Sequence, residues 1–240
     1  MKKGPLILLL VSISFVFSGC DILGIRGSGN IVENSYSLTD FTSIRASNTC
    51  DLTTMKGDEY SVIVSCDDNI LPYLEVYVTD NMLTLDLESG YFFSHIEFNV
   101  TVIMPELNSL KVSGASAAVV SGFQNSSSFY TDVSGASDVR IDFISSAHID
   151  CQVSGASELT ISSITSTGQM IIDCSGASEL DCKNTASTDG DIAVSGASEV
   201  YVNLSGALTA SVSGASALYY SGNPTLHNID ISGASRLERF

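Results

Sequence analysis

Apolar and polar residues alternate with a period of two along most of the chain. Such alternation is typical of β-strands that bury one face. It is clearest on both sides of the tetrapeptide Ser-Gly-Ala-Ser, which begins at Ser113, Ser134, Ser154, Ser175, Ser195, Ser213 and Ser232. The offsets between copies are 21, 20, 21, 20, 18 and 19 residues. Self-similarity at about twenty residues indicates a solenoid.

Aligning the seven copies shows which positions face inward. The residue directly before each copy is apolar: Val112, Val133, Val153, Cys174, Val194, Val212 and Ile231. The second residue after each copy is also apolar: Ala118, Val139, Leu159, Leu180, Val200, Leu218 and Leu237. Each repeat therefore predicts two short strands joined at the tetrapeptide, with identical residues stacked in columns from turn to turn. A helical repeat is excluded by the β-branched alternation and by the glycine in every unit.

The tetrapeptide itself fits a corner of the coil. Successive turns of a β-solenoid stack about 4.8 Å apart, so large side chains at a corner would collide, whereas Ser, Gly and Ala allow close backbone approach. Serine hydroxyls in one column can also form hydrogen bonds from turn to turn. Cys151, Cys174 and Cys182 fall on inward columns and are interpreted as small buried hydrophobic residues.

Residues 29–109 lack the tetrapeptide but keep the β pattern. The segment Ile44 to Leu52 matches Leu110 to Ala118, with Ser-Asn-Thr-Cys in place of Ser-Gly-Ala-Ser. Asp80-Asn81 separates two alternating segments and predicts a hairpin. We interpret this region as degenerate turns plus extra strands that cap one end of the solenoid, because an open end exposes strand edges.

The first 19 residues resemble a bacterial lipoprotein signal peptide. Lys2 and Lys3 precede an apolar segment from Leu6 to Phe17, which is too short to span a bilayer. Ser-Gly-Cys then resembles a lipobox, so cleavage before Cys20 would let this cysteine carry acyl chains. An ordinary secretory signal followed by a chance cysteine is the alternative. The predicted organisation is a signal over 1–19, a linker over 20–28, the degenerate β region over 29–109, and the repeat over 110–240.

The net charge of the chain limits the partners that it can bind. The chain carries 10 basic and 27 acidic side chains, a formal charge of −17, and removing Lys2 and Lys3 makes it −19. A nucleic-acid-binding protein needs basic residues to displace counterions from phosphates, so nucleic acid is excluded as a partner.

The cysteine count does not define a set of disulfide bonds. There are six, and if Cys20 carries lipid, the remaining five cannot all pair with one another. Cys50 and Cys66 are one candidate disulfide. No spacing typical of a metal site is present, and no metal or cofactor is predicted.

One column of the repeat gathers carboxylates. The position directly after the tetrapeptide holds Ala117, Asp138, Glu158, Glu179, Glu199, Ala217 and Arg236. Asp138, Glu158, Glu179 and Glu199 would therefore lie on four consecutive turns. They form a candidate face for a ligand or a cation such as Ca²⁺, or simply a solvated surface; paired acids also suit glycoside hydrolysis in principle.

Aromatic residues supply a second candidate surface. Tyr201 and Tyr219 occupy the same outward column on adjacent turns, and Tyr91 and Phe92 follow a glycine in a predicted loop. Exposed aromatic rings can stack on sugars or anchor a protein interface. The alternative is that they are ordinary strand and core residues. The three histidines are isolated, and no catalytic triad can be assembled from the spacing.

Several segments together resemble a known family. They are Gly29-Asn30-Ile31-Val32, Phe41-Thr42-Ser43-Ile44, and Val102-Ile103-Met104-Pro105-Glu106-Leu107 leading into Leu110-Lys111-Val112-Ser113-Gly114-Ala115. With the later repeats and the lipoprotein signal, they resemble the head GIN domain family, whose members are named autotransporter adhesins. The resemblance implies a right-handed parallel β-helix in secreted or lipid-anchored proteins, most often from Bacteroidetes, and no established catalytic residue.

The sequence thus predicts an all-β, non-enzymatic protein of the cell envelope, attached to a membrane, most simply the outer membrane, through lipid on Cys20. It would present its acidic face to a glycan or to an envelope or host protein. The alternatives are a polysaccharide lyase or hydrolase of the β-helix type, and a structural component that assembles with copies of itself.

Overall fold

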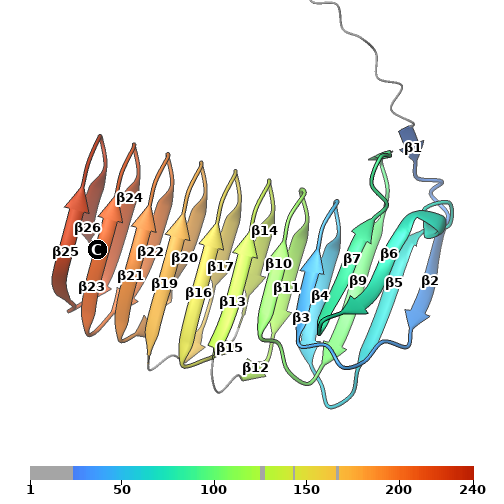
Figure 1. The fold of residues 1–240 in the computed structure, drawn as a ribbon, viewed down its shortest axis with the longest axis horizontal. Helices are drawn as coiled ribbons and strands as arrows, with labels where there is room; N and C mark the ends of the chain where they lie inside the picture. Colours follow the sequence, from blue (N-terminus) through green and yellow to red (C-terminus); the bar gives the residue numbers. More distant parts are fainter. Residues whose placement is uncertain (1–23, 125–127, 143, 166–167) are drawn as a thin grey trace, which may run out of the picture.

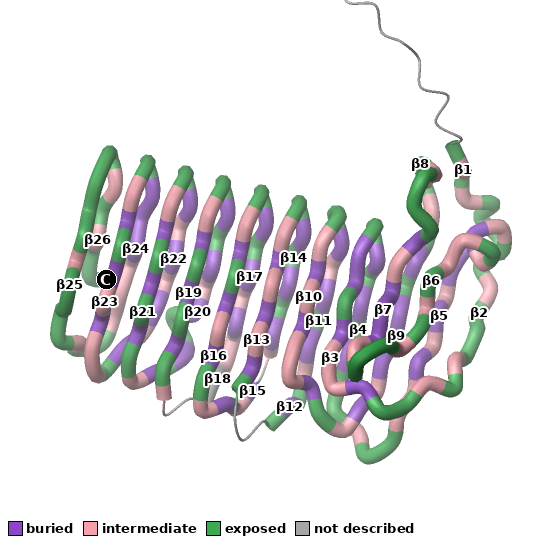
Figure 2. Tube along the Cα trace, in the orientation of Figure 1, coloured by how far each residue is buried: buried purple, intermediate pink, exposed green. Residues whose placement is uncertain are grey.

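The computed structural model describes residues 24–124, 128–142, 144–165 and 168–240. Two long sheets face each other along a β-solenoid, with the N-terminal strands at one end and the C-terminal strands at the other (Figure 1). Buried and exposed residues alternate along most of the turns (Figure 2). The predicted fold, a β-solenoid with turns of about 20 residues, is confirmed. Among the described residues, no helix has the length and apolarity needed to cross a bilayer.

One sheet has ten strands. Their order is β6 (Leu74–Thr79), β7 (Met82–Leu87), β3 (Ser43–Ala46), β10 (Ser109–Val112), β13 (Ser128–Val133), β16 (His148–Val153), β19 (Gln169–Cys174), β21 (Asp189–Val194), β23 (Ala207–Val212) and β25 (Thr225–Ile231). All neighbours in it are parallel except β6 and β7. These two form the predicted hairpin, and positive φ at Asp80 and Asn81, 51° and 62°, suits a type I′ turn.

The other sheet has fourteen strands. Its main order is β2 (Ile31–Tyr36), β5 (Ser61–Asp67), β9 (Phe98–Met104), β4 (Asp51–Lys56), β11 (Ala117–Ser121), β14 (Asp138–Ile141), β17 (Glu158–Ile161), β20 (Glu179–Ser187), β22 (Glu199–Leu204), β24 (Ala217–Gly222) and β26 (Arg236–Arg239). Three short strands extend it, β12 (Phe123–Gln124), β15 (Ile144–Ser145) and β18 (Ile164–Thr165). A separate parallel pair joins β1 (Gly24–Arg26) to β8 (Phe92–Ser94), and a 3-10 helix spans Leu71–Tyr73.

The tetrapeptide forms a corner between the two sheets. Ala177 donates its backbone N–H to Gly155 O, 2.8 Å away on the preceding turn. A Cβ atom on Gly176 would lie 2.4 Å from that same oxygen, and φ at Gly176 is +86°. Both the close approach and the positive φ require glycine, which confirms the predicted role of the motif.

The second serine of each motif is buried and links neighbouring turns. Ser178 Oγ donates to Ser175 O at 2.9 Å and accepts from the backbone N–H of Ser157 at 3.4 Å. Ser137 does the same with its own neighbours. Backbone N–H groups donate in the same way to the serine hydroxyls from Ser116 to Ser198, so the column links successive turns as predicted.

The N-terminal region departs from chain order. β3 lies between β7 and β10, and β4 lies between β9 and β11. The turn built from residues 82–104 therefore stacks outside the turn built from residues 43–56, and the repeat grows from the opposite side. Ile44 lies opposite Leu110 and Leu52 opposite Ala118, so the predicted match between these segments is confirmed.

The candidate disulfide between Cys50 and Cys66 is wrong. Both thiols are free and buried. Cys66 pairs with Phe98 across β5 and β9, and the next residue of β9 pairs with Asp51. Phe98 thus lies between the two cysteines, which are about 9.6 Å apart at two strand spacings, farther than a disulfide spans. Cys151, Cys174 and Cys182 are fully buried among apolar residues, as predicted.

The two ends of the solenoid differ. Antiparallel strands β2, β5 and β6 lie at the N-terminal end, where Phe41 and Ile70 are fully buried. The predicted cap is therefore present. At the other end, β25 and β26 form the last turn, and Leu226 and Ile231 are 46% and 45% exposed.

Candidate functional site

The outer face of the fourteen-stranded sheet carries the predicted acidic column. Asp138 pairs with Glu158, Glu158 with Glu179, and Glu179 with Glu199. Ala117 and Ala217 flank these four residues, and Arg236 follows Ala217 on the last turn. The repeat length and the parallel register together place the four carboxylates in one row, at about the 4.8 Å strand spacing.

Electrostatic repulsion is strongest in the middle of this row. Partial burial raises the pKa of the Glu179 carboxyl, and the charges of Glu158 and Glu199 raise it further. Lys183 offsets part of the effect. A site that holds like charges this close favours a cationic partner, because such a partner relieves the repulsion.

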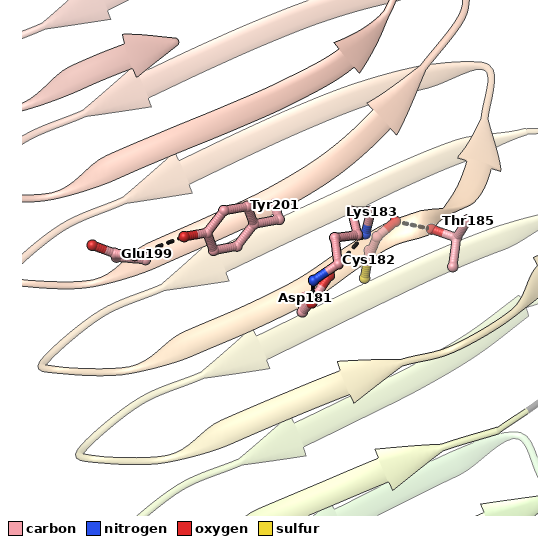
Figure 3. Close-up of polar contacts among 6 residues, drawn as sticks. All are labelled: Asp181, Cys182, Lys183, Thr185, Glu199 and Tyr201. Atoms are coloured by element: carbon pink, nitrogen blue, oxygen red, sulfur yellow. Dashed lines mark hydrogen bonds and ion pairs between the residues drawn. The ribbon is translucent and has the colours of Figure 1, made fainter. Parts of the chain in front are cut away.

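Tyr201 and Tyr219 lie in the next outward column of the same sheet. Their ring centroids are 4.7 Å apart and the ring planes differ by only 9°, so the two rings are stacked. Tyr201 also donates its hydroxyl to Glu199 Oε2 at 2.9 Å (Figure 3). Burial and this contact with Glu199 raise the pKa of Tyr201 to about 12.

Two cations lie against the stacked tyrosines. Lys183 Nζ is 5.8 Å from the ring centroid of Tyr201, and the Arg236 guanidinium is 5.2 Å from that of Tyr219. Lys183 also pairs with Asp181, while Arg236 Nε donates to the Tyr219 hydroxyl at 3.0 Å (the Lys183 pair is drawn in Figure 3). The rings are therefore occupied by each other and by cations, which leaves little open ring face for stacking on a sugar.

A shallow hollow of about 270 Å³ opens at the other end of the acidic row. Asp138, Arg140 and Glu158 line it together with the small side chain of Ala117. Arg140 Nε forms an ion pair with Asp142 at 2.7 Å. In the part of the chain that the structure describes, no three His, Cys, Asp or Glu residues are grouped so that they could hold a metal ion.

The other predicted aromatic residues are not part of this face. Tyr91 and Phe92 lie in an arm, residues 88–95, at the N-terminal end of the solenoid, far along the stack from Tyr201 and Tyr219 (Figure 1). Tyr91 packs edge-on against Tyr73 at 4.8 Å, while Phe92 is 59% exposed. The predicted lipid attachment residue, Cys20, lies outside the described residues.

Sequence reasoning missed three residues of the tyrosine cluster. Lys183 and Arg236 contact the two rings, and Phe240 lies 6.2 Å from Tyr201 with its ring edge-on. The aligned repeats contained a signal for Arg236, because it occupies the acidic column two turns after Glu199. Its ion pair with Glu199, 3.9 Å across the small Ala217, follows from that spacing.

Comparison with known proteins identifies a family and several similar folds. The family model described as "Putative auto-transporter adhesin, head GIN domain" matches residues 40–224. No curated protein matches the chain. A putative adhesin from Bacteroides fragilis has a similar fold, with a TM-score of 0.81 and 18% identity over 90% of this chain and 100% of that one.

Two further solved structures also share the fold. A putative adhesin from Parabacteroides merdae gives a TM-score of 0.69 at 16% identity, over 90% of this chain and 99% of that one. A putative lipid binding protein from Parabacteroides distasonis gives 0.60 at 16% identity over the same shares. On the match to more than half of its length, the chain belongs to the head GIN domain family of putative auto-transporter adhesins.

Proposed function

We propose that this protein is a lipid-anchored adhesin of the bacterial outer membrane that binds a partner protein through the outer face of its fourteen-stranded sheet. The family description and the adhesin names of similar folds support a role in binding. The lipobox-like segment ending in Cys20 supports the anchor. The observation that carries the binding site is the in-register row of Asp138, Glu158, Glu179 and Glu199.

The chemistry of the face indicates a basic partner. Two cations next to the row, Arg140 and Lys183, are each paired with an aspartate, and Arg236 pairs with Glu199. Among the described residues, the carboxylates of Asp138, Glu158 and Glu179 therefore remain in excess. Lysine or arginine side chains on an extended segment of an envelope or host protein could meet carboxylates repeated at strand spacing. A neutral glycan would rely on aromatic stacking, which the Tyr201–Tyr219 pair offers little room for.

An array of purified host matrix proteins and cell-wall glycans tests this proposal. We expect binding to basic proteins that weakens as salt rises, because the attraction is between charges. The double variant Glu158→Gln/Glu179→Gln should weaken it about tenfold or more, a factor that corresponds to about 1.4 kcal/mol. The matched control is Asp173→Asn/Asp191→Asn, which removes the same charge from exposed positions of the ten-stranded sheet.

Two results would contradict the proposal. Binding confined to glycans and unaffected by the double variant would move the site away from the acidic row. Turnover of uronate-rich polysaccharides that is lost in Glu158→Ala or Glu179→Ala would instead support the polysaccharide-active alternative.

A further inference from the structure

Residues 24–30, which begin four positions after the predicted acyl anchor, are held against the solenoid by backbone and side-chain contacts. β1 pairs in parallel with β8, so that Gly24 lies opposite Phe92 and Arg26 opposite Ser94. Gly27 N then donates to Ser94 O at 3.1 Å. Residues 24–26, which belong to the predicted linker over 20–28, therefore form a strand that pairs with the aromatic arm.

A second set of contacts fixes residues 26–30 to the end of β5. Asn69 Nδ2 donates to Arg26 O at 2.9 Å, and Ser28 Oγ donates to Asp68 at 2.6 Å. The buried Asp67 carboxylate accepts from Gly29 N at 2.6 Å and from Glu97 N at 2.7 Å. These contacts join residues 26–30 to the capped end of the solenoid, and β1 joins the same segment to the arm.

The arm presents one aromatic side chain outward. Ile25 and Phe93 pack against the core, whereas Phe92 is 59% exposed on the opposite face, next to the open surface above Gly24. Alternation along the paired strands places Arg26 on that same outer face. The arm does not fold down on the first corner: a hollow of about 390 Å³ separates it from Asn48, Thr49 and Gly114.

Chain length limits how far the arm can be from a membrane. Four residues from Cys20 to Gly24 extend at most about 14 Å. A lipid attached to Cys20 would therefore hold β1 and the arm close to the headgroup layer. The tip, Ser89 to Phe92, is uncharged, whereas the rest of the protein is strongly acidic and is repelled by anionic headgroups.

From this placement we propose that the arm seats Phe92 in the lipid interface beside the acyl anchor, with Arg26 near the headgroups, and so fixes the orientation of the solenoid on the membrane. The inference rests on the proposed lipid attachment at Cys20. Aromatic rings favour the boundary between headgroups and acyl chains, and acyl chains on Cys20 hold the protein on the membrane without fixing its orientation. The arm thus supplies a second contact, from residues that are hydrogen-bonded to the end of the solenoid.

Because the chain contains no tryptophan, Phe92→Trp gives the acylated protein a single tryptophan reporter. The protein is bound to vesicles of phosphatidylethanolamine and phosphatidylglycerol with and without brominated phosphatidylcholine, which quenches only tryptophans that reach the acyl region. We expect at least twofold quenching and a blue-shifted emission. Phe240→Trp is the matched control, since Phe240 is 55% exposed at the far end of the solenoid, and its emission should not change.

Failure of the arm and failure of the anchor give different results. The mass of the N-terminal peptide reports acylation of Cys20 directly. If the peptide carries no lipid, the chain beginning at Cys20 is coupled to a maleimide lipid, which the five buried thiols do not reach. The same result overturns the proposal for the acylated protein and for the maleimide-lipid conjugate. It is overturned if Phe92→Trp on vesicle-bound protein is not quenched, or if both variants are quenched equally.

A second variant tests the energetic contribution of the contact. When both proteins carry one acyl chain, coupled to Cys20 as a maleimide lipid, Phe92→Ser should leave the vesicles about tenfold faster than the parent protein. Partial burial of one aromatic side chain stabilises the bound state by about that factor. Thermal unfolding should be unchanged, because Phe92 is exposed. An unchanged rate of desorption would contradict insertion of the ring.

Discussion

The N-terminal region and the repeat hold adjacent turns together by different means. In the repeat, successive corners form the same backbone hydrogen bond, from the alanine of one motif to the glycine of the motif one turn earlier. Ala197 N, for example, donates to Gly176 O at 2.7 Å. In the N-terminal region, side chains add contacts that each occur only once. At the first corner, Ser47 and Asn48 both donate to the Asp86 carboxylate of β7.

The first corner also differs in its backbone. Asn48 and Thr49 have positive φ values of 56° and 63°, and Thr49 N donates to Gly114 O on the following turn. In the later corners the donor points to the preceding turn instead. Where a turn stacks on a copy of itself, the same residues must therefore recur at each corner. A turn at the cap can use unrelated residues, provided that individual side chains form hydrogen bonds with its neighbours.

The strongest test of this comparison removes the close approach at one repeated corner. Gly176→Ala should destabilise the protein by about 2–5 kcal/mol. Of this, about 1–2 kcal/mol comes from the positive φ, and about 1–3 kcal/mol from overlap with Gly155 O. Urea unfolding followed by far-ultraviolet circular dichroism measures the loss.

Gly122→Ala is the matched control for Gly176→Ala. Gly122 has a similar φ of +82°, but the atom nearest to its added Cβ would be Lys56 Cβ at 3.7 Å, an ordinary contact. It should lose only the backbone part, about 1–2 kcal/mol. Equal losses at the two positions would mean that the tight stacking of corners contributes nothing, and the proposed difference between the two regions would not hold.

The next test removes a contact that the N-terminal region makes only once. Asp67→Ala should cost about 2–3 kcal/mol, because two backbone N–H groups, at Gly29 and Glu97, lose their acceptor. The loss should be local. Amide hydrogen exchange should speed up over residues 24–30 and remain unchanged in β19, whereas equal acceleration in both segments would show that the cap and the repeat unfold as one unit.

Much of the architecture could be predicted from the sequence because repetition makes a local pattern visible many times. The corners, the inward columns and the acidic row all follow from aligned copies. Even the degenerate segment from Ile44 to Leu52 could be placed opposite Leu110 to Ala118, since burial imposes the same alternation on both.

The order of the turns at the capped end could not be predicted. Alternation shows that residues 43–56 and 82–104 form strands, but it does not indicate which edge of a turn receives the next one. The hydrogen bonds that the Asp67 carboxylate accepts could not be predicted either. An Asp-Asp-Asn segment reads as an exposed turn, and only the structure shows that its first carboxylate is 1% exposed and satisfies backbone donors from two other segments.

A smaller effect is expected for the serine column. Ser178→Ala should lower the free energy of unfolding by about 1–2 kcal/mol, because Ser157 N–H loses its acceptor in a buried corner.

Cys50 occupies the equivalent position at the first corner, where Ser116 Oγ accepts from Cys50 N at 3.1 Å. Cys50→Ser should therefore be neutral or stabilising by up to about 1 kcal/mol. Chemical denaturation of both variants measures this; a large loss for Cys50→Ser would show that the first corner cannot accept the repeat's residue.

The smallest expected effect concerns the cost of repetition, since stacking identical residues also stacks identical charges. Glu179→Gln should stabilise the folded protein at pH 7 by about 0.2–0.5 kcal/mol, a small value because the side chain is exposed and screened. The matched control lies in the same column: Asp51 has Asn99 and Ala117 as its neighbours, so Asp51→Asn should change stability by less.

The pH dependence gives this last prediction its sign. Because the folded state raises the pKa of Glu179, it binds a proton more readily than the unfolded state does, and the penalty is fully present above the folded pKa. The penalty is relieved as pH falls through that pKa and is absent below the unfolded value of about 4.5. The stability difference between Glu179→Gln and the parent should therefore shrink on acidification, and also in high salt. A difference that stayed constant with pH would show that the glutamine acts through packing, and the row of carboxylates would then carry no cost that a basic partner could relieve.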